Sequence, residues 1–201
     1  MEASYLTRHP FAKDVLGIVI FIACVVVGTI LINTFVFRSF NVVGPSMETT
    51  LFTGDRLIVD RLPVTLAQLQ NKTYVPKRGQ VIVFKNPHFS VGLEDEYIVK
   101  RVIGLPGERV LLKDGKYTVF NDQYPTGFNP DDANRGEPGS PTSGETDTVV
   151  PEGEIFVSGD HRQGNYSYDS RNGLGTIPLY DVIGPAGIRV FPFNKIRTFP
   201  T

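Results

Sequence analysis

The sequence contains one cysteine and lacks the motifs of nucleotide-binding proteins. Because Cys24 is the single cysteine among 201 residues, no disulfide forms within the chain and no group of cysteines can hold zinc. A Gly-rich phosphate loop ending in Lys-Ser/Thr is missing, and no GxGxxG fingerprint follows a predicted strand. The formal net charge is −1, so nothing in the composition favours binding to nucleic acid.

The three histidines, His9, His88 and His161, do not form a metal-ligand pattern. His9 precedes a long apolar run, which leaves two histidines without the spacing of a metal site. We therefore expect no metal site and no cofactor. The pentapeptide GPSME, residues 44–48, lacks the second glycine of the GxSxG motif, which argues against an α/β-hydrolase.

A long apolar run is present near the N-terminus. Residues 15–37 carry no charged side chain. As a helix they would extend about 35 Å at about 1.5 Å per residue, enough to cross a hydrocarbon core of about 30 Å. A cleaved signal peptide would have a shorter apolar core and an Ala-x-Ala site after it, and no such site follows. The run predicts one transmembrane helix, and we see no second span.

Basic residues weakly favour a cytoplasmic N-terminus. Arg8 and Lys13 precede the apolar run, whereas Arg38 stands alone just after it. The positive-inside rule then places residues 1–14 in the cytoplasm and residues 38–201 on the extracytoplasmic side of the cell membrane.

The rest of the sequence predicts a mainly β fold. It is rich in Gly and Pro, with 20 and 15 residues, and its apolar segments are short, β-branched and separated by turns. Asp114-Gly115 is a two-residue hairpin signal, and Pro106-Gly107 suits a type II turn. Residues 63–76 predict one helical turn. The predicted strands lie in residues 56–62, 79–86, 96–104, 108–122, 154–160 and 186–193.

The strand pattern predicts a main β domain with a small insertion. Residues 38–107 and 152–201 would form the main domain, and residues 108–151 a small β subdomain. Within it, residues 126–148 are polar and rich in Gly, Pro and Asp, which predicts a mobile excursion of the chain between strands.

Two residues are candidates for chemistry, Ser46 and Lys100. Ser46 lies on a Gly-Pro corner close after Arg38, and therefore near the predicted membrane surface. Lys100 lies in a predicted strand, where alternation puts it on one face with Ile98 and Val102. Because burying an ammonium group is costly, an exposed lysine that protects a sheet edge from aggregation is the simpler interpretation.

A functional role for Lys100 requires a lowered pKa. An ordinary lysine pKa of about 10.4 leaves about 1 in 2,500 side chains neutral at pH 7, whereas desolvation lowers the pKa by up to about 3–5 units. A desolvated Lys100 could take the proton of a serine hydroxyl. A Ser-His-Asp arrangement of Ser46 with His161 is the alternative. Because His161 lies in a Gly-flanked polar turn, a surface role is simpler for it.

Four sequence blocks together resemble a known family. They are GPSMETTLFTGDRLIVDR at residues 44–61, RGQVIVFKNP at 78–87, YIVKRVIGLPGERV at 97–110 and VSGDHRQGNYSYDSRNGLGTIP at 157–178. Their order and spacing are similar to those of the bacterial type I signal peptidases (leader peptidases), from the apolar run to about Pro185. This resemblance makes an active-site role the preferred interpretation of Lys100.

The resemblance implies a membrane-anchored serine endopeptidase that removes N-terminal signal peptides from exported preproteins with a Ser-Lys dyad. Ser46, in the SM pair, would be the nucleophile, and Lys100, in the KR pair, the general base. Ser167 would hydrogen-bond and orient Lys100, and Met47 would pack beneath the nucleophile. The residues that would brace the site are Asp160, Asp169, Ser170, Arg171 and Arg101.

The resemblance also implies substrate and partners. The family accepts small residues, typically Ala, at the first and third positions before the cut. Phe40, Val42 and Val99 would line these pockets, although alternation along the strand points Val99 away from Lys100. The signal peptide would lie extended against sheet edges. The expected partners are signal-peptide-bearing preproteins and the lipid bilayer, without nucleic acid, and the protein would be a monomer.

Three features depart from the family pattern. Gly44 stands where some members have a serine that serves the oxyanion hole, so the backbone N–H of Ser46 would supply it instead. Thr49 stands where proline is usual, which predicts a looser turn after the nucleophile. His161 stands where asparagine is usual, and the stretch before Ser167 is longer than the common pattern.

Two other protein classes share part of this pattern. A self-cleaving Ser-Lys repressor would use the same chemistry, but it would have a DNA-binding helical domain in place of the apolar span. A catalytically inactive, membrane-tethered β domain that binds partners is the remaining alternative. Its surface would not require Ser46 and Lys100 together.

Overall fold

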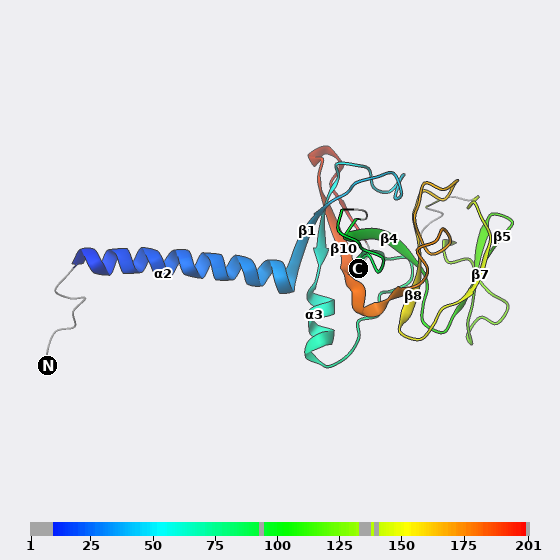
Figure 1. Cartoon of the computed structure of the whole chain (residues 1–201), viewed down its shortest axis with the longest axis horizontal. Coiled ribbons are helices and arrows are strands. Elements are labelled where there is room, and N and C mark those ends of the chain that lie inside the picture. The colour runs from blue at the N-terminus through cyan, green and yellow to red at the C-terminus, as the bar shows by residue number, and fades with distance from the viewer. Residues whose placement is uncertain (1–9, 93–94, 133–137, 139–140, 200–201) are drawn as a thin grey trace.

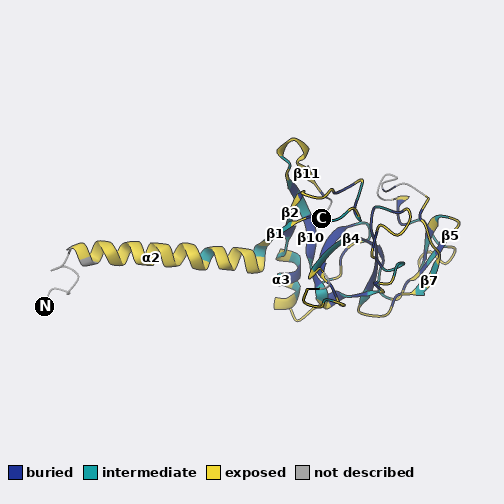
Figure 2. Cartoon of the chain, turned by 45° about the horizontal axis from the view of Figure 1, so that its top comes forward, coloured by how far each residue is buried: buried dark blue, intermediate teal, exposed yellow. Residues whose placement is uncertain are grey.

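The computed structural model consists of a long apolar helix joined directly to a mainly β domain (Figure 1). It describes residues 10–92, 95–132, 138 and 141–199. The helix α2 (Pro10–Leu31) continues into a π-helix, η1 (Ile32–Val36), and the first strand, β1 (Phe37–Asn41), follows without a linker. The helix projects away from the domain and is exposed along nearly all of its length (Figure 2).

The predicted membrane span corresponds to Lys13–Val36, 24 residues long and apolar enough to cross a bilayer. Its end differs from the prediction by one residue, because Phe37 pairs with Asp60 in a sheet. The α-helix begins earlier than predicted, at Pro10, while residues 1–9 of the predicted cytoplasmic segment lie outside the described residues. The prediction of a mainly β chain with one N-terminal apolar helix is confirmed.

The main sheet contains eight antiparallel strands in the order β1-β2-β10-β3-β4-β8-β9, with β11 paired to β10. Short 3₁₀ turns, η3 (Leu179–Asp181) and η4 (Phe193–Lys195), flank β10. Beyond β1, its strands are β2 (Arg56–Asp60), β3 (Val81–Lys85), β4 (Tyr97–Gly104), β8 (Glu154–Ser158), β9 (Ile177–Pro178), β10 (Val182–Phe191) and β11 (Arg197–Thr198).

β10 joins the two halves of the sheet and makes it curl. Its residues 182–185 pair with β3, its residues 186–191 pair with β2, and register shifts interrupt both ladders. Such bulges bend a strand. At Gly184 a Cβ atom would lie 2.2 Å from the carbonyl oxygen of Asp60, so only glycine permits this approach of the two strands. The curl brings β1 and β4 to opposite sides of one cleft.

Alternating side chains of β3 contribute to two separate parts of the core. Ile82 and Phe84 join an apolar cluster with residues of β4, β8 and β9. Val81 instead joins a second cluster that contains Met47 and Leu57. This is the period of two that the sequence shows in VIVF. The second cluster therefore anchors the residue that follows Ser46.

Three further strands form a small separate sheet in the order β6-β5-β7. The hairpin turns at Asp114-Gly115 as predicted, with positive φ angles of 50° and 76° and with Lys113 opposite Lys116. A third apolar cluster packs this sheet against the ends of β4 and β8. The strands are β5 (Arg109–Lys113), β6 (Lys116–Phe120) and β7 (Thr146–Val149).

The polar segment at residues 126–148 differs from the predicted mobile excursion. Thr146–Thr148 belong to β7, and the Asp131 side chain pairs with buried Arg162. Residues 133–137 and 139–140 of the segment lie outside the described residues.

The helix α3 (Leu62–Leu69) is longer than the single predicted turn. Pro63 lies in its first turn, where a missing N–H costs no hydrogen bond. The helix lies at the end of the domain from which α2 emerges (Figure 1).

Candidate active site

A cleft of about 590 Å³ lies between the chain that leaves β1, residues 40–46, and the first half of β4, residues 95–100. Among the strands that the structure describes, each wall carries an edge with no neighbouring strand. β1 is the last strand of its sheet, and β8 pairs with β4 only from Arg101 onwards. The cleft therefore has room for an extended peptide between two free edges.

Ser46 and Lys100 meet in this cleft. Lys100 Nζ lies 2.8 Å from Ser46 Oγ and 2.9 Å from the carbonyl oxygen of Val99, its own neighbour in the strand. Lys100 comes from the middle of β4, and Ser46 from the turn after β1. The two candidates that the sequence singled out are thus within hydrogen-bond distance.

Lys100 is buried, with 3% of its surface exposed, so it does not protect an open sheet edge. Burial lowers the pKa of Lys100 to about 8, against the opposing attraction of the Asp169, Asp160 and Asp95 carboxylates. At this pKa about one lysine in eleven is neutral at pH 7. The side chain therefore meets the requirement for a base that acts near neutral pH.

The turn that carries Ser46 is held on both sides. Gly44 has φ of +87°, a conformation that favours glycine, and its N–H donates to Thr53 Oγ1 at 3.0 Å. After the serine, Glu48 N–H donates to the Pro45 carbonyl at 3.0 Å, and Met47 is fully buried in the second cluster. Met47 thus fixes the backbone from which Ser46 projects.

Gly159 is a site residue that the sequence reasoning missed. A Cβ atom at this position would lie 2.2 Å from Ser167 Oγ and 2.3 Å from the Ser46 carbonyl oxygen. The absence of a side chain therefore lets three backbone segments converge at Ser46. Its position just before Asp160, directly after a strand, is a signal that could have been used.

Ser167 is fully buried beside Gly159, but its hydroxyl makes no hydrogen bond within the described part of the chain. The expected hydrogen bond to Lys100 is not formed. Lys100 uses two donors, toward Ser46 and Val99. A lysine ammonium has three donors, so one remains available.

Asp169 and Arg171 organise the loop that carries Ser167. The Asp169 carboxylate accepts hydrogen bonds from Gly159 N–H at 2.9 Å and from Arg171 Nε at 3.2 Å. The Asp169 and Arg171 side chains are both fully buried. Arg171 also donates to the carbonyl oxygens of Arg162, at 2.5 Å, and His161, at 3.1 Å. Buried charges that are paired and hydrogen-bonded in this way hold their loops in one geometry.

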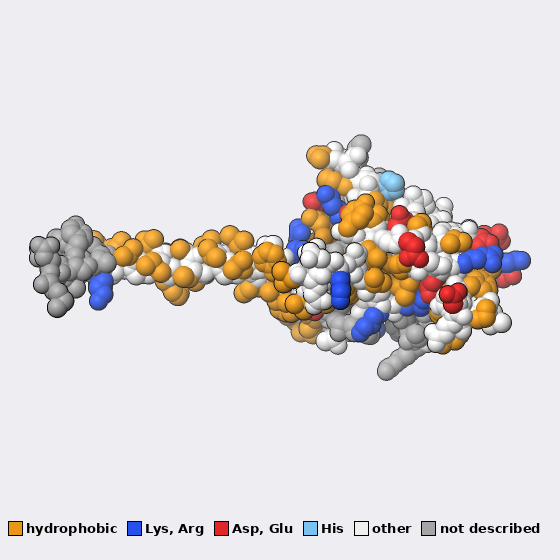
Figure 3. Space-filling view, turned by 90° about the horizontal axis from the view of Figure 1, so that it is seen from below, with side chains coloured by type: hydrophobic (Ala, Val, Ile, Leu, Met, Phe, Trp, Pro, Cys, Tyr) orange, Lys and Arg blue, Asp and Glu red, His pale blue; other side chains and the backbone are white. Residues whose placement is uncertain are grey.

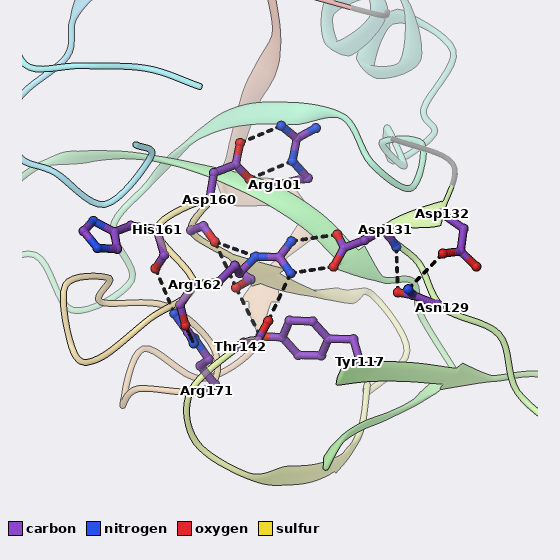
Figure 4. A network of polar contacts seen from close by, with 12 residues as sticks. Arg101, Tyr117, Asn129, Asp131, Asp132, Thr142, Asp160, His161, Arg162 and Arg171 are labelled. Atoms are coloured by element: carbon purple, nitrogen blue, oxygen red, sulfur yellow. Dashed lines mark hydrogen bonds and ion pairs between the residues drawn. The ribbon is translucent and has the colours of Figure 1, made fainter. Parts of the chain in front are cut away.

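Ser170 and Asp160 tie the same loops to the sheet. Ser170 Oγ accepts from Val157 N–H of β8 at 2.9 Å. Asp160 accepts two hydrogen bonds from Arg101 of β4, at 2.7 and 2.6 Å, in a bidentate pair (Figure 4). Because Arg101 follows Lys100 in the strand, this pair fixes the position of the chain next to Lys100.

A second buried Arg–Asp pair was not found from the sequence. Arg162 donates to both carboxylate oxygens of Asp131, at 2.5 and 2.7 Å, and to the Gly159 carbonyl at 2.9 Å (Figure 4). Its guanidinium also lies over the Tyr117 ring, 5.2 Å from the centroid. Asp131 belongs to the polar segment predicted as mobile, so composition concealed its partner.

Tyr117, on β6, links the small sheet to the loops around Ser46. Burial raises the pKa of Tyr117 to about 12, so the phenol stays protonated, and it donates to Ser158 Oγ at 3.1 Å. Ser158 Oγ in turn lies 3.3 Å from the Asp169 carboxylate. The small sheet is thereby hydrogen-bonded to the loop at the cleft.

His161 does not take the place of a catalytic base. Its Nδ1 lies 3.2 Å from the Pro45 carbonyl oxygen, and its ring stacks on Tyr166 with centroids 4.5 Å apart. Its backbone N–H donates to the Ser46 carbonyl at 3.1 Å. In the described residues, no three His, Cys, Asp or Glu side chains lie close enough together to hold a metal ion.

The predicted pocket residues Phe40, Val42 and Val99 all line the cleft. Val42 is buried in the second apolar cluster, and Val99 packs against the same cluster. Val99 and Lys100 both reach the cleft because it follows the free edge of β4, and because the long lysine side chain turns back to the Val99 carbonyl. Alternation along the strand therefore does not separate them.

Comparisons with known proteins bear on this cleft. The family described as "Signal peptidase, peptidase S26" matches residues 13–191. A signal peptidase I of Bacillus licheniformis is 36% identical over 178 residues, which cover 86% of each chain. Signal peptidase I T of Bacillus subtilis (strain 168) is 33% identical over 170 residues, covering 84% of this chain and 81% of that protein.

Among solved structures, a crystal structure of a signal peptidase I from Enterococcus faecalis V583 is 28% identical, with a TM-score of 0.41. The match covers 55% of this chain and 95% of that one.

The family match includes the apolar helix, both walls of the cleft and the loops that brace it. The curated relatives are similar over more than four fifths of this chain, so the resemblance is not confined to one motif. The predicted family and the predicted hydrolase class are confirmed. The chain belongs to the signal peptidase family, peptidase S26.

Proposed function

We propose that this chain is a membrane-anchored serine endopeptidase that removes signal peptides from preproteins with a Ser46–Lys100 dyad. One observation carries the proposal: buried Lys100 Nζ lies 2.8 Å from Ser46 Oγ, inside a cleft with two free strand edges. Membership of the signal peptidase family supports the same activity.

In the first step, neutral Lys100 acts as general base. Its lone pair takes the Ser46 hydroxyl proton as Oγ attacks the carbonyl carbon of the residue before the cut. The protonated amine then gives this proton to the leaving amino group, and an acyl-enzyme remains. In the second step Lys100 takes a proton from a water molecule as the water oxygen attacks the ester carbonyl carbon. Lys100 then gives this proton to Ser46 Oγ as the ester bond breaks, which releases the carboxylic acid product and restores the Ser46 hydroxyl and the neutral amine.

The neutral amine has two N–H donors and one lone pair, and the cleft offers a partner for each. In the neutral amine, the lone pair would accept the Ser46 hydroxyl proton across the 2.8 Å contact, and one N–H would donate to the Val99 carbonyl. Ser167 Oγ, buried and without a partner in the described chain, is the acceptor we propose for the second N–H. This bond would direct the lone pair at Ser46.

The charged residues around the dyad form ion pairs that hold the surrounding loops in position. Asp160 with Arg101, and Asp169 with Arg171, are neutralised pairs, which limits the attraction that would keep Lys100 protonated. Ser170 fixes the second loop to β8. We assign these five residues to positioning rather than to chemistry.

The backbone N–H of Ser46 would stabilise the oxyanion of the tetrahedral intermediate. Gly44 provides no hydroxyl, and its φ of +87° strains any other residue at this position. Loss of one donor from an oxyanion hole commonly costs about 100- to 1,000-fold in rate. We therefore infer a slower enzyme than a relative that has serine at this position.

The substrate would bind as an extended strand between β1 and β4. Its backbone would pair with the two free edges, and the side chains before the cut would enter pockets lined by Phe40, Val42 and Val99. These walls are apolar and near one another, which favours small residues such as Ala at the first and third positions before the cut.

The apolar helix supplies the membrane anchor. Lys13–Val36 would cross the bilayer once, with the N-terminus in the cytoplasm and the β domain on the extracytoplasmic side. The cleft would then lie close to the surface at which a signal peptide emerges. We propose that the protein works there as a monomer, because one chain supplies both dyad residues and both walls.

The alternative is a catalytically inactive β domain that binds partners through the same cleft. The proximity of Ser46 and Lys100 argues against it, because peptide binding alone does not require a buried lysine at a serine hydroxyl.

A cleavage assay tests the proposal. Full-length protein in detergent is incubated with a preprotein that has an Ala-x-Ala site. We expect the wild type to cut after the second Ala and the Ser46→Ala and Lys100→Ala variants to lose at least about 1,000-fold in kcat/KM. Mass spectrometry of the products identifies the bond that is cut.

Matched variants control for indirect effects. Ser90→Ala and Lys116→Ala change an exposed serine and an exposed lysine, and they should cleave at the wild-type rate. Full activity of Lys100→Ala would refute the dyad. A wild type that binds the preprotein but never cuts it would support the inactive binding domain instead.

A further inference from the structure

A second hollow, of about 300 Å³, lies next to the turn that carries Ser46. The cleft between β1 and β4 is lined by this turn up to Ser46, whereas the second hollow is lined by the turn after it, at Glu48 and Thr49. The rest of its lining includes the loop after β8, from Asp160 to Gln163. The two hollows therefore lie on either side of Ser46 along the turn.

The stacked rings of His161 and Tyr166 stand between the two hollows. Tyr166 lines the cleft, and His161 lines the second hollow. His161 contacts the turn at two points: its backbone N–H donates to the Ser46 carbonyl at 3.1 Å, and its Nδ1 lies 3.2 Å from the Pro45 carbonyl oxygen. Its ring points away from the buried ion pairs of the same loop (Figure 4). A peptide that extends past Ser46 would run along these rings from one hollow to the other.

Contacts across the cleft indicate the direction of a bound peptide. At one end of the cleft the Phe40 and Tyr97 rings face each other, with centroids 5.2 Å apart, and at the other end Ser46 meets Lys100. A peptide cannot follow the edge of β4 further, because β8 pairs with β4 from Arg101 onwards. If the residues before the cut fill the cleft, the residues after the cut must leave past Ser46, toward the second hollow.

Glu48 gives the second hollow a negative charge without a partner. Its side chain is partly exposed, and its carboxylate makes no hydrogen bond or ion pair within the described part of the chain. The other charged residues of the lining, Asp160 and Arg162, each form a buried ion pair with a residue of opposite charge. Glu48 therefore determines the charge that a ligand meets in this hollow.

No large field of one sign obscures this local charge. The formal net charge of the chain is −1, and acidic and basic side chains are scattered in small groups over the face shown in Figure 3. Exposed charges are screened beyond about 8 Å at physiological salt. Glu48 therefore acts on the few ligand residues that lie nearest to it.

We propose that the second hollow binds the residues that follow the cut in the preprotein, and that Glu48 selects basic side chains among them. Lys or Arg at the second or third position after the cut is attracted by the Glu48 carboxylate, whereas Asp or Glu there is repelled. His161 and Tyr166 direct the chain into the hollow. This inference rests on the proposed endopeptidase activity and adds a substrate preference to it.

The positions follow from the reach of the two chains. Glu48 follows Ser46 by two residues, so their Cα atoms lie at most about 7 Å apart. An extended substrate advances about 3.3 Å per residue. Its second and third residues after the cut therefore lie at a comparable distance from Ser46.

Three preproteins test the charge preference. They share one Ala-x-Ala site and differ only in Lys-Lys, Gln-Gln or Glu-Glu at the second and third positions after the cut. Full-length protein in detergent cleaves each of them at low ionic strength, and kcat/KM is measured. Because partly exposed charge pairs are weak, we expect the wild type to favour Lys-Lys over Glu-Glu by about fivefold, with Gln-Gln between them and with added salt reducing the ratio.

Variants of Glu48 identify the source of the preference. Glu48→Gln should bring the ratio of Lys-Lys to Glu-Glu cleavage close to one, and Glu48→Lys should invert it. The matched control is Glu152→Gln, an exposed glutamate in the turn before β8, which should keep the wild-type ratio. Ratios are compared within each variant, so a general loss of activity from a disturbed turn does not affect the result.

Three outcomes would overturn the inference and leave the proposed function intact. They are a wild type that cuts all three preproteins equally, Glu48 variants that keep the wild-type ratio, and an equal preference when the same charges are moved to the tenth and eleventh positions after the cut. The last outcome would assign the effect to the charge of the whole substrate. A wild type that cuts none of the preproteins would instead refute the proposed function, and this inference with it.

Discussion

At the scale of single residues, Lys100 is the side chain whose surroundings matter most. Its folded-state pKa of about 8 lies below the ordinary value of 10.5. The unfolded chain therefore holds this proton more tightly, and folding with a buried lysine is disfavoured by about 3 kcal/mol below pH 8. This cost decreases as pH rises from 8 to 10.5 and is absent above it. A neutral base is thus obtained at the expense of stability.

The same shift predicts how activity depends on pH. If Lys100 must be neutral, kcat/KM should rise about tenfold from pH 6 to pH 7 and level off above an apparent pKa of about 8. A pH profile of preprotein cleavage between pH 6 and 9 measures this. A flat profile would contradict a lysine base.

His161→Asn is the control for this profile. The His161 ring lies at the Pro45 carbonyl rather than at Ser46 Oγ. The variant should therefore show the same rise of kcat/KM with pH as the wild type. A limb that disappears in His161→Asn would assign the titrating group to the histidine instead.

At the scale of elements, two loops approach each other at Ser46, and one glycine makes this approach possible. The turn after β1 and the loop after β8 approach each other at Gly159, where His161 N–H also donates to the Ser46 carbonyl. Asp169 accepts from Gly159 N–H and so holds the second loop in place. The position of Ser46 therefore depends on loop contacts as much as on its own turn.

Gly159→Ala should displace these loops. The new Cβ would overlap the Ser46 carbonyl oxygen, a backbone atom that cannot turn aside. We expect a loss of roughly 100-fold in kcat, as for a displacement of about 1 Å in an active site, and a destabilisation of about 1–3 kcal/mol. Cleavage kinetics and thermal unfolding followed by circular dichroism measure the two effects.

Gly187→Ala in β10 is the matched substitution. A Cβ there would lie 3.4 Å from the Ile58 carbonyl oxygen, an ordinary contact distance, so activity should stay within about twofold. The interpretation fails if the two variants behave alike.

At the scale of the whole molecule, the small sheet and the main sheet share a buried polar connection. Arg162 links Asp131, in the segment after β6, to Gly159 beside Ser46. Tyr117 on β6 reaches Asp169 through Ser158. A buried apolar cluster that includes Tyr117 packs between the two sheets beside this connection. The small sheet β6-β5-β7 thus helps to hold the loops around Ser46 in position.

Asp131→Asn tests this support. It keeps the shape of the side chain but leaves the buried Arg162 charge without its partner, which should lower the free energy of unfolding by about 3–5 kcal/mol. Asp147→Asn breaks the Arg109–Asp147 pair on the exposed side of the small sheet, where solvent screens the charges, and should leave the free energy of unfolding nearly unchanged. Thermal unfolding measures the loss of stability in each variant. Equal losses would show that the buried Arg162–Asp131 pair contributes no more to stability than the exposed Arg109–Asp147 pair.

Much of the fold could be predicted from the sequence because the signals are local. Apolar runs, alternation and turn residues give the span, most strands and the Asp114-Gly115 hairpin. The second hollow was not predicted, because Glu48 and His161 lie far apart in the chain and no pattern joins them. The partner of Asp131 was hidden in a polar segment for a related reason: composition does not say which residue far along the chain it meets.

The sequence by itself determined that an apolar span precedes a mainly β domain, and its motifs directed attention to Ser46 and Lys100. These conclusions rest on periodicity and on residue order, which need no coordinates. Only the tertiary structure decided that the lysine is buried within 2.8 Å of the serine, that Gly159 lets the loops close on it, and that Glu48 and His161 line one hollow beside the serine. The reason is physical: burial, pKa and contact depend on how the sheet curls, and the curl depends on pairings between residues far apart in the chain.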